Sequence, residues 1–183
     1  MNKKFSQLNE ELKKCNKVVI LSHNKPDGDT TAANLALRFY LETLGKNVTS
    51  ACADEIPENM KFLPKADSFK QEFLLEDFDT VIVVDAGAKH LVRFFEIYPE
   101  LNRTKKPIIC IDHHASNEQF GTFNLIDANE TSTTTLLYKF FKDQNIEITA
   151  DMATCLLNGI YTDTGSFMHA NTKAETLKTS SEL

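Results

Sequence analysis

Histidine and aspartate residues, whose side chains bind metal ions, recur in four short segments of this sequence. The candidate ligands are His23, Asp27, Asp29, Asp85, Asp112, His113, His114 and Asp163. Carboxylates that are brought close together repel one another, and bound cations are the natural way to neutralise them. Histidine and aspartate ligands without cysteine favour Mn²⁺, with Mg²⁺, Co²⁺ and Zn²⁺ as alternatives. An aspartate can bridge two ions about 3.5–4 Å apart, the separation used in two-metal phosphoryl chemistry.

The first segment, from His23 to Asp29 (HNKPDGD), follows an apolar run and carries more functional groups than a turn requires. Pro26 fixes φ and Gly28 tolerates positive φ, so the loop can curl and direct its aspartates inward. Taken alone, Asp27 and Asp29 would be turn and cap residues, with Asp29 placed to cap the next helix. His23 alone would be a structural residue. The other three segments favour metal ligation instead.

Apolar runs alternate with amphipathic stretches along the chain. The expected strands are residues 17–22, 48–53, 79–86 and 107–114, with a short fifth strand in FNLIDAN. The expected helices are residues 2–15, 30–44, 88–98, 132–142 with Ser132 as N-cap, and 150–164, with a short helical turn at 57–63. This alternation predicts an α/β fold, a mostly parallel central sheet with helices on both faces.

Three of the expected strands end directly in polar side chains. The first ends in His23, the third in Asp85 and the fourth in Asp112-His113-His114. Ligands of such sheets bind beyond the carboxyl ends of the strands, so these side chains should meet at one edge. Because neighbouring residues of an extended chain point to opposite sides, we expect one adjacent histidine to bind metal and the other to face the substrate.

Composition sets limits on what this chain can be. Its 183 residues suffice for one α/β domain, and its net charge of −6 argues against general attraction to nucleic acid. The sequence has no apolar stretch of membrane-spanning length, and its charged, amphipathic first residues do not resemble a secretion signal. Four cysteines without a CxxC pair indicate buried, reduced thiols and a cytoplasmic protein. No phosphate-binding GxxxxGK[ST] or GxGxxG loop occurs, which disfavours a nucleotide triphosphatase or a dehydrogenase.

Four motifs carry a resemblance to a known family. HNKPDGD, VVDAG, CIDHHASNEQFG and GIYTDTGSF, in this order and spacing, resemble the motifs of the DHH phosphoesterase superfamily. The run IDHHASNEQFGTFNLIDANETSTTTLLY is most similar to the branch of oligoribonucleases (nanoRNases) and pAp phosphatases. The resemblance covers roughly residues 17–172.

The resemblance implies two divalent ions, most simply Mn²⁺, held by six side chains. The implied ligands are His23 and Asp27 for the first ion, Asp29, His113 and Asp163 for the second, and Asp85 as a bridge between them. Asp163 lies in TDTG at a helix end, where a turn or cap role is a fair alternative.

The remaining two residues of the DHH motif are implied to assist the reaction. Asp112 would orient a histidine ring, and His114 would face the substrate phosphate. The implied reaction is hydrolysis of a phosphate ester by a hydroxide that two metal ions activate. The implied substrates are short RNA, pAp, pApA or dinucleotides, and no membrane is involved.

Some positions depart from this branch. Thr30-Thr31 stands where the branch has a small Gly-Ser pair, His90 where an arginine is common, and Met168 where a basic residue is common. None of these departures affects a metal ligand. The branch also carries a C-terminal substrate-binding domain, whereas this chain stops at TLKTSSEL. We therefore expect residues 1–183 to be one catalytic domain, ending in a helix toward a missing second domain and weakly active alone.

Two other functions stay open from the sequence. A pyrophosphatase or polyphosphatase of the same superfamily would share the metal ligands but not the substrate. A non-catalytic nucleotide-binding module would lack hydrolysis altogether. The oligomeric state, a homodimer included, is also left open.

Overall fold

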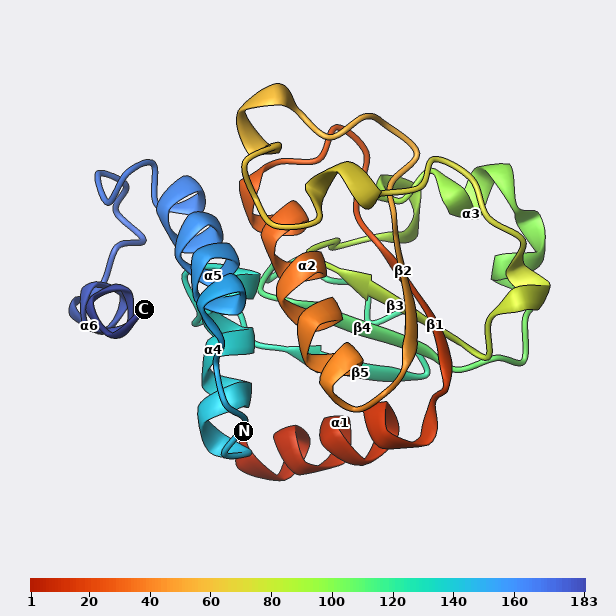
Figure 1. Ribbon diagram of the computed structural model, residues 1–183, viewed down its shortest axis with the longest axis horizontal. Helices are drawn as coiled ribbons and strands as arrows, with labels where there is room; N and C mark the ends of the chain where they lie inside the picture. The colour runs from red at the N-terminus through yellow and green to blue at the C-terminus, as the bar shows by residue number, and fades with distance from the viewer.

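The central element of the fold is a five-stranded parallel sheet with the strand order β2-β1-β3-β4-β5 (Figure 1). This computed structural model describes residues 1–183. The strands are β1 (Lys17–Leu21), β2 (Asn47–Ala51), β3 (Thr80–Val84), β4 (Ile108–Asp112) and β5 (Phe123–Ile126). β3 and β4 are buried at every position, as expected for parallel strands that are covered on both faces. The predicted α/β fold is confirmed.

Helices cover the two faces of the sheet unequally. The helices are α1 (Asn2–Lys14), α2 (Gly28–Thr43), α3 (Phe94–Ile97), α4 (Thr133–Asp143), α5 (Ala150–Asp163) and α6 (Ala174–Glu182). One face carries α1, α2, α4 and α5 over a core of 32 buried residues. The other face carries only α3 and short 3₁₀ turns over a core of 12 buried residues (Figure 1). Most of the apolar burial therefore lies on the face that also positions the ends of α2, α4 and α5.

The helix predicted over residues 88–98 is only partly present. The segment forms a 3₁₀ turn at Lys89–Leu91 and the one-turn helix α3, separated by Val92 in an extended conformation. A loop after β1 interrupts the helix: the Asn24 backbone N–H donates to the carbonyl oxygen of Leu91 (2.8 Å), and the Arg93 N–H donates to Asn24 Oδ1 (2.7 Å). These bonds take the place of helical hydrogen bonds, and they tie the loop after β1 to the loop after β3.

The caps of α2 and α4 fix where the helices begin. α2 begins at Gly28 rather than at residue 30, and its N-cap is Asp27, whose Oδ1 accepts from the Asp29 and Thr30 N–H groups at 3.0 Å. The predicted capping role of Asp29 is therefore wrong, because Asp29 lies within the first turn. Ser132 is the N-cap of α4, as predicted, and accepts from the Thr135 N–H.

Other features agree with the composition. The cysteines at positions 15, 52, 110 and 155 are all buried and unpaired. None of the six helices combines the length and the apolar character that crossing a membrane requires. α6, predicted as a C-terminal helix, is present and buries Thr176 and Thr179 against the rest of the domain.

Candidate metal centre

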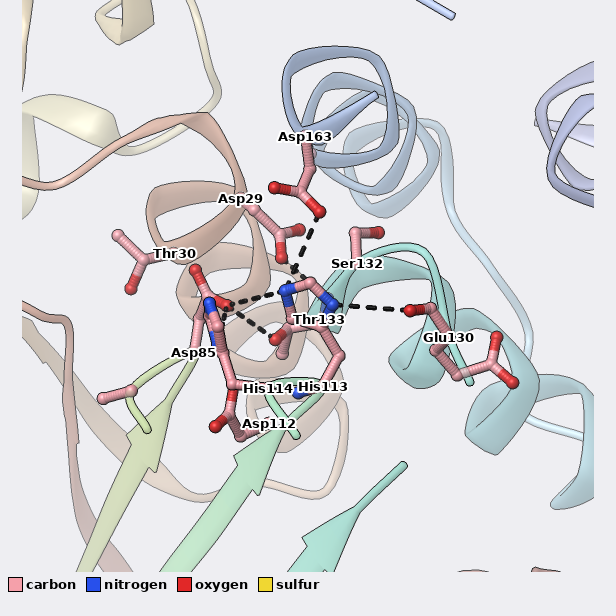
Figure 2. A network of polar contacts seen from close by, with 12 residues as sticks. Asp29, Thr30, Asp85, Asp112, His113, His114, Glu130, Ser132, Thr133 and Asp163 are labelled. Carbon is pink, nitrogen blue, oxygen red and sulfur yellow. Dashed lines mark hydrogen bonds and ion pairs between the residues drawn. The ribbon is translucent and has the colours of Figure 1, made fainter. Parts of the chain in front are cut away.

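The predicted ligands gather at the carboxyl edge of the sheet, and Figure 2 labels those other than His23 and Asp27. His23 follows β1, Asp85 follows β3, and Asp112 ends β4. The starts and ends of helices supply the rest: Asp27 and Asp29 at the start of α2, and Asp163 at the end of α5. Segments that are up to 140 residues apart in sequence therefore meet in one cluster, as the strand-end rule predicts.

One group of possible ligands consists of His23, Asp27 and Asp85, whose ligand atoms lie within 4.8 Å of one another. His23 Nε2 lies 3.7 Å from Asp27 Oδ1 and 3.6 Å from Asp85 Oδ2. His23 Nδ1 lies 2.7 Å from the Asn24 carbonyl oxygen, to which it can only donate. In the neutral imidazole this hydrogen bond leaves the lone pair on Nε2, which faces the two carboxylates.

A second group consists of Asp29, His113 and Asp163, again with ligand atoms within 4.8 Å. His113 Nε2 lies 3.7 Å from Asp163 Oδ2 and 3.6 Å from Asp85 Oδ1 (Figure 2). The opposite ring nitrogen, Nδ1, lies 3.4 Å from the carbonyl oxygen of Glu130. His113 therefore presents Nε2 to carboxylates in the same way as His23.

Asp85 lies between the two groups. Its Oδ2 approaches His23 and its Oδ1 approaches His113. It is 2% exposed and has φ +56°, a left-handed conformation that few residues other than glycine, asparagine and aspartate adopt readily. Such a conformation at the end of a buried strand is a marker of functional sites.

The distances within the two groups fit a shared ion better than direct hydrogen bonds. Separations of 3.6–3.7 Å are too long for hydrogen bonds. Two ligand atoms that each lie about 2.1 Å from one ion are about 3.0–3.6 Å apart at angles of 90–120°. In addition, Asp163 Oδ2 is buried and has no hydrogen-bond partner. A buried, unpaired carboxylate oxygen that faces a histidine lone pair fits a cation.

The pKa values of the cluster also indicate that a positive charge is needed between its carboxylates. Burial raises the pKa of Asp29 well above its usual range, and the carboxylates of Asp85 and Asp163 raise it further. Burial also raises the pKa of Asp163. Burial alone would lower the pKa of His23, but the carboxylates of Asp27 and Asp85 outweigh it and raise this pKa to about 10. All three shifts favour the protonated form of these groups when no cation is near.

Asp112 and His114 lie beside the two groups, and with Asp85 and His113 they form a third set of possible ligands whose atoms lie within 4.8 Å of one another. The carboxylate of Asp112 is fully buried and accepts from His114 Nδ1 (2.7 Å), Asn117 Nδ2 (2.6 Å) and the His113 backbone N–H (2.8 Å). Burial would raise the pKa of Asp112, but the hydrogen bonds from His114 and Asn117 lower it overall. The hydrogen bond to Asp112 in turn raises the pKa of His114 to about 9, so this ring is a cation near neutral pH.

The two adjacent histidines do not point to opposite sides as expected, while the division between a metal ligand and a substrate contact stays a prediction. β4 ends at Asp112, so His113 and His114 lie beyond the extended strand, and their ring centroids are 4.4 Å apart. His114 Nδ1 also lies 3.8 Å from Asp85 Oδ1. Because this nitrogen donates to Asp112, however, it has no lone pair for a metal. Hydrogen bonding, rather than side-chain direction, distinguishes the two rings.

Sequence reasoning missed several residues of the site. Thr133 and Thr134, in the first turn of α4, donate hydrogen bonds to Asp85 and Asp29. Asn117 donates a hydrogen bond to the carboxylate of Asp112. The signal in the sequence was the run STTT at 132–135, which holds more hydroxyl groups than one helix cap needs.

Several known proteins whose names denote hydrolases are similar to this chain. A relative from Thermus thermophilus named bifunctional oligoribonuclease and PAP phosphatase NrnA is 30% identical over 167 residues, 91% of this chain and 49% of the relative. A relative from Lactobacillus delbrueckii named "probable manganese-dependent inorganic pyrophosphatase" is 25% identical over 154 residues, 81% of this chain and 48% of the relative. The chain thus spans about half the length of these relatives.

A solved structure and a family description agree with the fold. The crystal structure of an exopolyphosphatase-related protein from Bacteroides fragilis matches with a TM-score of 0.89 at 22% identity, over 100% of this chain and 56% of that one. The description of the DHH family, N-terminal domain, matches residues 17–160, which include every member of the two ligand groups except Asp163. Together with the strand-end cluster, this match shows that the chain belongs to the DHH family.

Proposed function

We propose that this domain is a phosphoesterase that depends on two divalent ions, most simply Mn²⁺, and hydrolyses short oligoribonucleotides, pAp, or both. The main support is the position of Asp85, whose two oxygens approach histidines of two different ligand groups. One ion would be held by His23, Asp27 and Asp85, and the other by Asp29, His113 and Asp163, with Asp85 shared between the two through its contact with His113.

The chemistry of the site would be divided between the ions and the chain. When bound, two such ions make water nucleophilic near neutral pH and neutralise charge on the phosphoryl oxygens. His114 would contribute a cation whose Nδ1 is held by Asp112, leaving its Nε2–H free to donate to a phosphate oxygen. The His114 side chain is 47% exposed, so a substrate can reach it.

The choice of substrate rests on the relatives rather than on the cluster. The relative named oligoribonuclease and PAP phosphatase shares more identity with this chain than the one named pyrophosphatase, 30% against 25%. Both names concern phosphorus–oxygen bonds, so one ligand arrangement can serve either. We therefore propose nucleotide substrates first and keep inorganic pyrophosphate as the second candidate.

A direct assay separates these candidates. The purified chain, stripped with a chelator and reloaded with Mn²⁺, is incubated with pAp, pApA or pyrophosphate at equal concentrations, and the products are separated by chromatography. Asp163→Asn serves as the metal-ligand variant. Asp127→Asn is the matched control, because Asp127 Oδ1 accepts from the Asn129 N–H in a turn outside both ligand groups.

We expect Mn²⁺-dependent hydrolysis of pAp or pApA by the wild type and by Asp127→Asn, and a large loss in Asp163→Asn. Faster hydrolysis of pyrophosphate would instead support the second candidate. Absence of metal-dependent hydrolysis for all three substrates would contradict the proposal and favour a non-catalytic nucleotide-binding module.

A further inference from the structure

The first turn of α4 lies against the two proposed ion sites (Figure 2). The Thr133 N–H donates to Asp29 Oδ2 at 2.7 Å, while the Thr134 N–H and hydroxyl donate to Asp29 Oδ1 at 3.1 and 2.6 Å. The Thr133 hydroxyl donates to Asp85 Oδ1 at 2.9 Å. Each threonine hydroxyl is therefore committed to one carboxylate, Thr133 to Asp85 and Thr134 to Asp29.

These hydroxyl groups are not needed to cap their own helix. Ser132 already caps α4 through the Thr135 N–H, at 3.0 Å. The carboxylates that Thr133 and Thr134 contact come from segments 48 and 105 residues earlier in the chain. A cap alone would leave both hydroxyls free to bond within the helix, so their use on distant carboxylates requires another explanation.

Asp29 also fixes the direction of a chain of buried hydroxyls. As a carboxylate it can only accept, so the Thr134 hydroxyl must donate to it. Thr134 Oγ1 then accepts from the Ser132 hydroxyl at 2.8 Å, and Ser132 Oγ accepts from the Thr135 hydroxyl at 2.9 Å. All three hydroxyls thus point their hydrogens toward Asp29, and such chains polarise one another.

The backbone of α5 packs directly against the hydrogen bond between Thr134 and Asp29. A Cβ placed on Gly159 would lie 2.4 Å from Thr134 Oγ1 and 2.6 Å from Asp29 Oδ1. The helix therefore passes so close to the hydrogen bond that only glycine fits. Asp29 and Thr134 are 1% and 0% exposed, so solvent water cannot replace a lost hydroxyl.

We propose that Thr133 and Thr134 are positioning residues for the metal ligands. Thr133 holds the bridging carboxylate of Asp85, and Thr134 holds Asp29, so that the unused lone pairs of each face the ions. This inference rests on the proposed two-ion centre and adds which residues fix its geometry. Hydrogen-bond partners of metal ligands typically change metal affinity about 10–100-fold when removed.

The test measures Mn²⁺ binding rather than turnover. Free Mn²⁺ is followed by electron paramagnetic resonance while the full chain is titrated, which yields both affinity and stoichiometry. Thr133→Val and Thr134→Val remove one hydroxyl each, and Thr133→Ser and Thr134→Ser restore it. Thr131→Val is the matched control, because this buried hydroxyl bonds to Thr176 Oγ1 at 2.7 Å and to the Asn171 carbonyl oxygen at 3.3 Å, but to no member of the ligand groups.

We expect Thr133→Val to lower the affinity for both ions about 10–100-fold, and Thr134→Val to lower the affinity for only one of them by that factor. The serine variants should regain affinity, and Thr131→Val should bind both ions like the wild type. In Thr134→Val a methyl group replaces the hydroxyl beside Asp29. If this variant does not fold, Thr134→Ala, which places no methyl group there, is used in its place.

Two results would overturn this inference. Either folded Thr133→Val and Thr134→Val bind two ions with wild-type affinity, or Thr131→Val loses affinity to the same extent. A wild type that binds two Mn²⁺ ions but is insensitive to the threonine variants refutes only the positioning role. A wild type that binds no Mn²⁺ refutes the proposed function as well.

Discussion

Replacing Asp85 by asparagine is the sharpest test of the two-ion arrangement. The change removes one charged oxygen and keeps the shape of the side chain. Asparagine tolerates the left-handed conformation at φ +56°, so the backbone cost is small. The amide oxygen can still accept the Thr133 hydroxyl that lies 2.9 Å from Asp85 Oδ1. The variant should therefore fold, and its defect should appear only when metal is added.

The size of that defect follows from linkage. An ion at 100 times its Kd stabilises a folded protein by about 2.7 kcal/mol, so two ions contribute roughly 5 kcal/mol. For a chain of 183 residues, about 1 kcal/mol corresponds to roughly 2–4 °C in Tm. Saturating Mn²⁺ should thus raise the Tm of the wild type by roughly 10–20 °C. If Asp85→Asn lowers the affinity for both ions about 100-fold, the stabilisation by metal falls to about 0.8 kcal/mol, or roughly 2–3 °C in Tm.

Thermal unfolding with and without Mn²⁺, combined with a count of bound ions after equilibrium dialysis, checks this expectation. Asp127→Asn is the control and should behave like the wild type, since its side chain bonds only within its own turn. If Asp85→Asn retains two ions and a metal-induced rise above 10 °C, Asp85 does not bridge the ions. Loss of only one ion would place Asp85 in a single ligand group.

Three further predictions concern the same cluster. Burial raises the pKa of Asp163, so its protonated carboxyl group adds stability at acidic pH, and this contribution is lost as the pH rises through that pKa. In chelator, Asp163→Asn should therefore melt above the wild type at pH 8, with a smaller gap at pH 5, as calorimetry can measure. Gly159→Ala should cost about 1–3 kcal/mol in urea unfolding, because its new methyl group would meet Thr134 at 2.4 Å; an unchanged free energy of unfolding would show that α5 can move away. The hydrogen bond to Asp112 raises the pKa of His114 to about 9, so its stabilising contribution is complete below about pH 6.5 and lost as the pH rises through 9. The metal-free wild type should therefore lose more stability between pH 7 and pH 10 than His114→Gln does, and parallel pH profiles would contradict this origin of the shift.

The positions of the strands, and with them most of the cluster, could be predicted from the sequence. Strands that are buried on both faces appear as uninterrupted apolar runs, and β3, predicted over 79–86, occupies Thr80–Val84. In a parallel sheet all such runs deliver their carboxyl ends to one edge. Knowing that His23, Asp85 and Asp112 end strands was therefore enough to predict that they meet.

What could not be predicted depends on hydrogen bonds between distant segments. Asn24 interrupts the helix expected over residues 88–98, and no local pattern near residue 92 reveals that bond. The threonines of α4 read as helix-capping residues, because their carboxylate partners lie 48 and 105 residues away. The orientation of His114 likewise depends on where β4 ends and on the buried Asp112.

When no ion is bound, the clustered carboxylates destabilise the folded chain. Asp29, Asp85 and Asp163 are brought together where burial, together with the neighbouring carboxylates, raises the pKa of Asp29 and Asp163. The amide groups at the start of α4 offset part of this cost at Asp29, since a helix N-terminus stabilises negative charge. No corresponding donor reaches Asp163 Oδ2. The charge that the fold leaves unbalanced therefore lies at the end of α5, beside His113 Nε2, which is where a cation would stabilise the folded chain most.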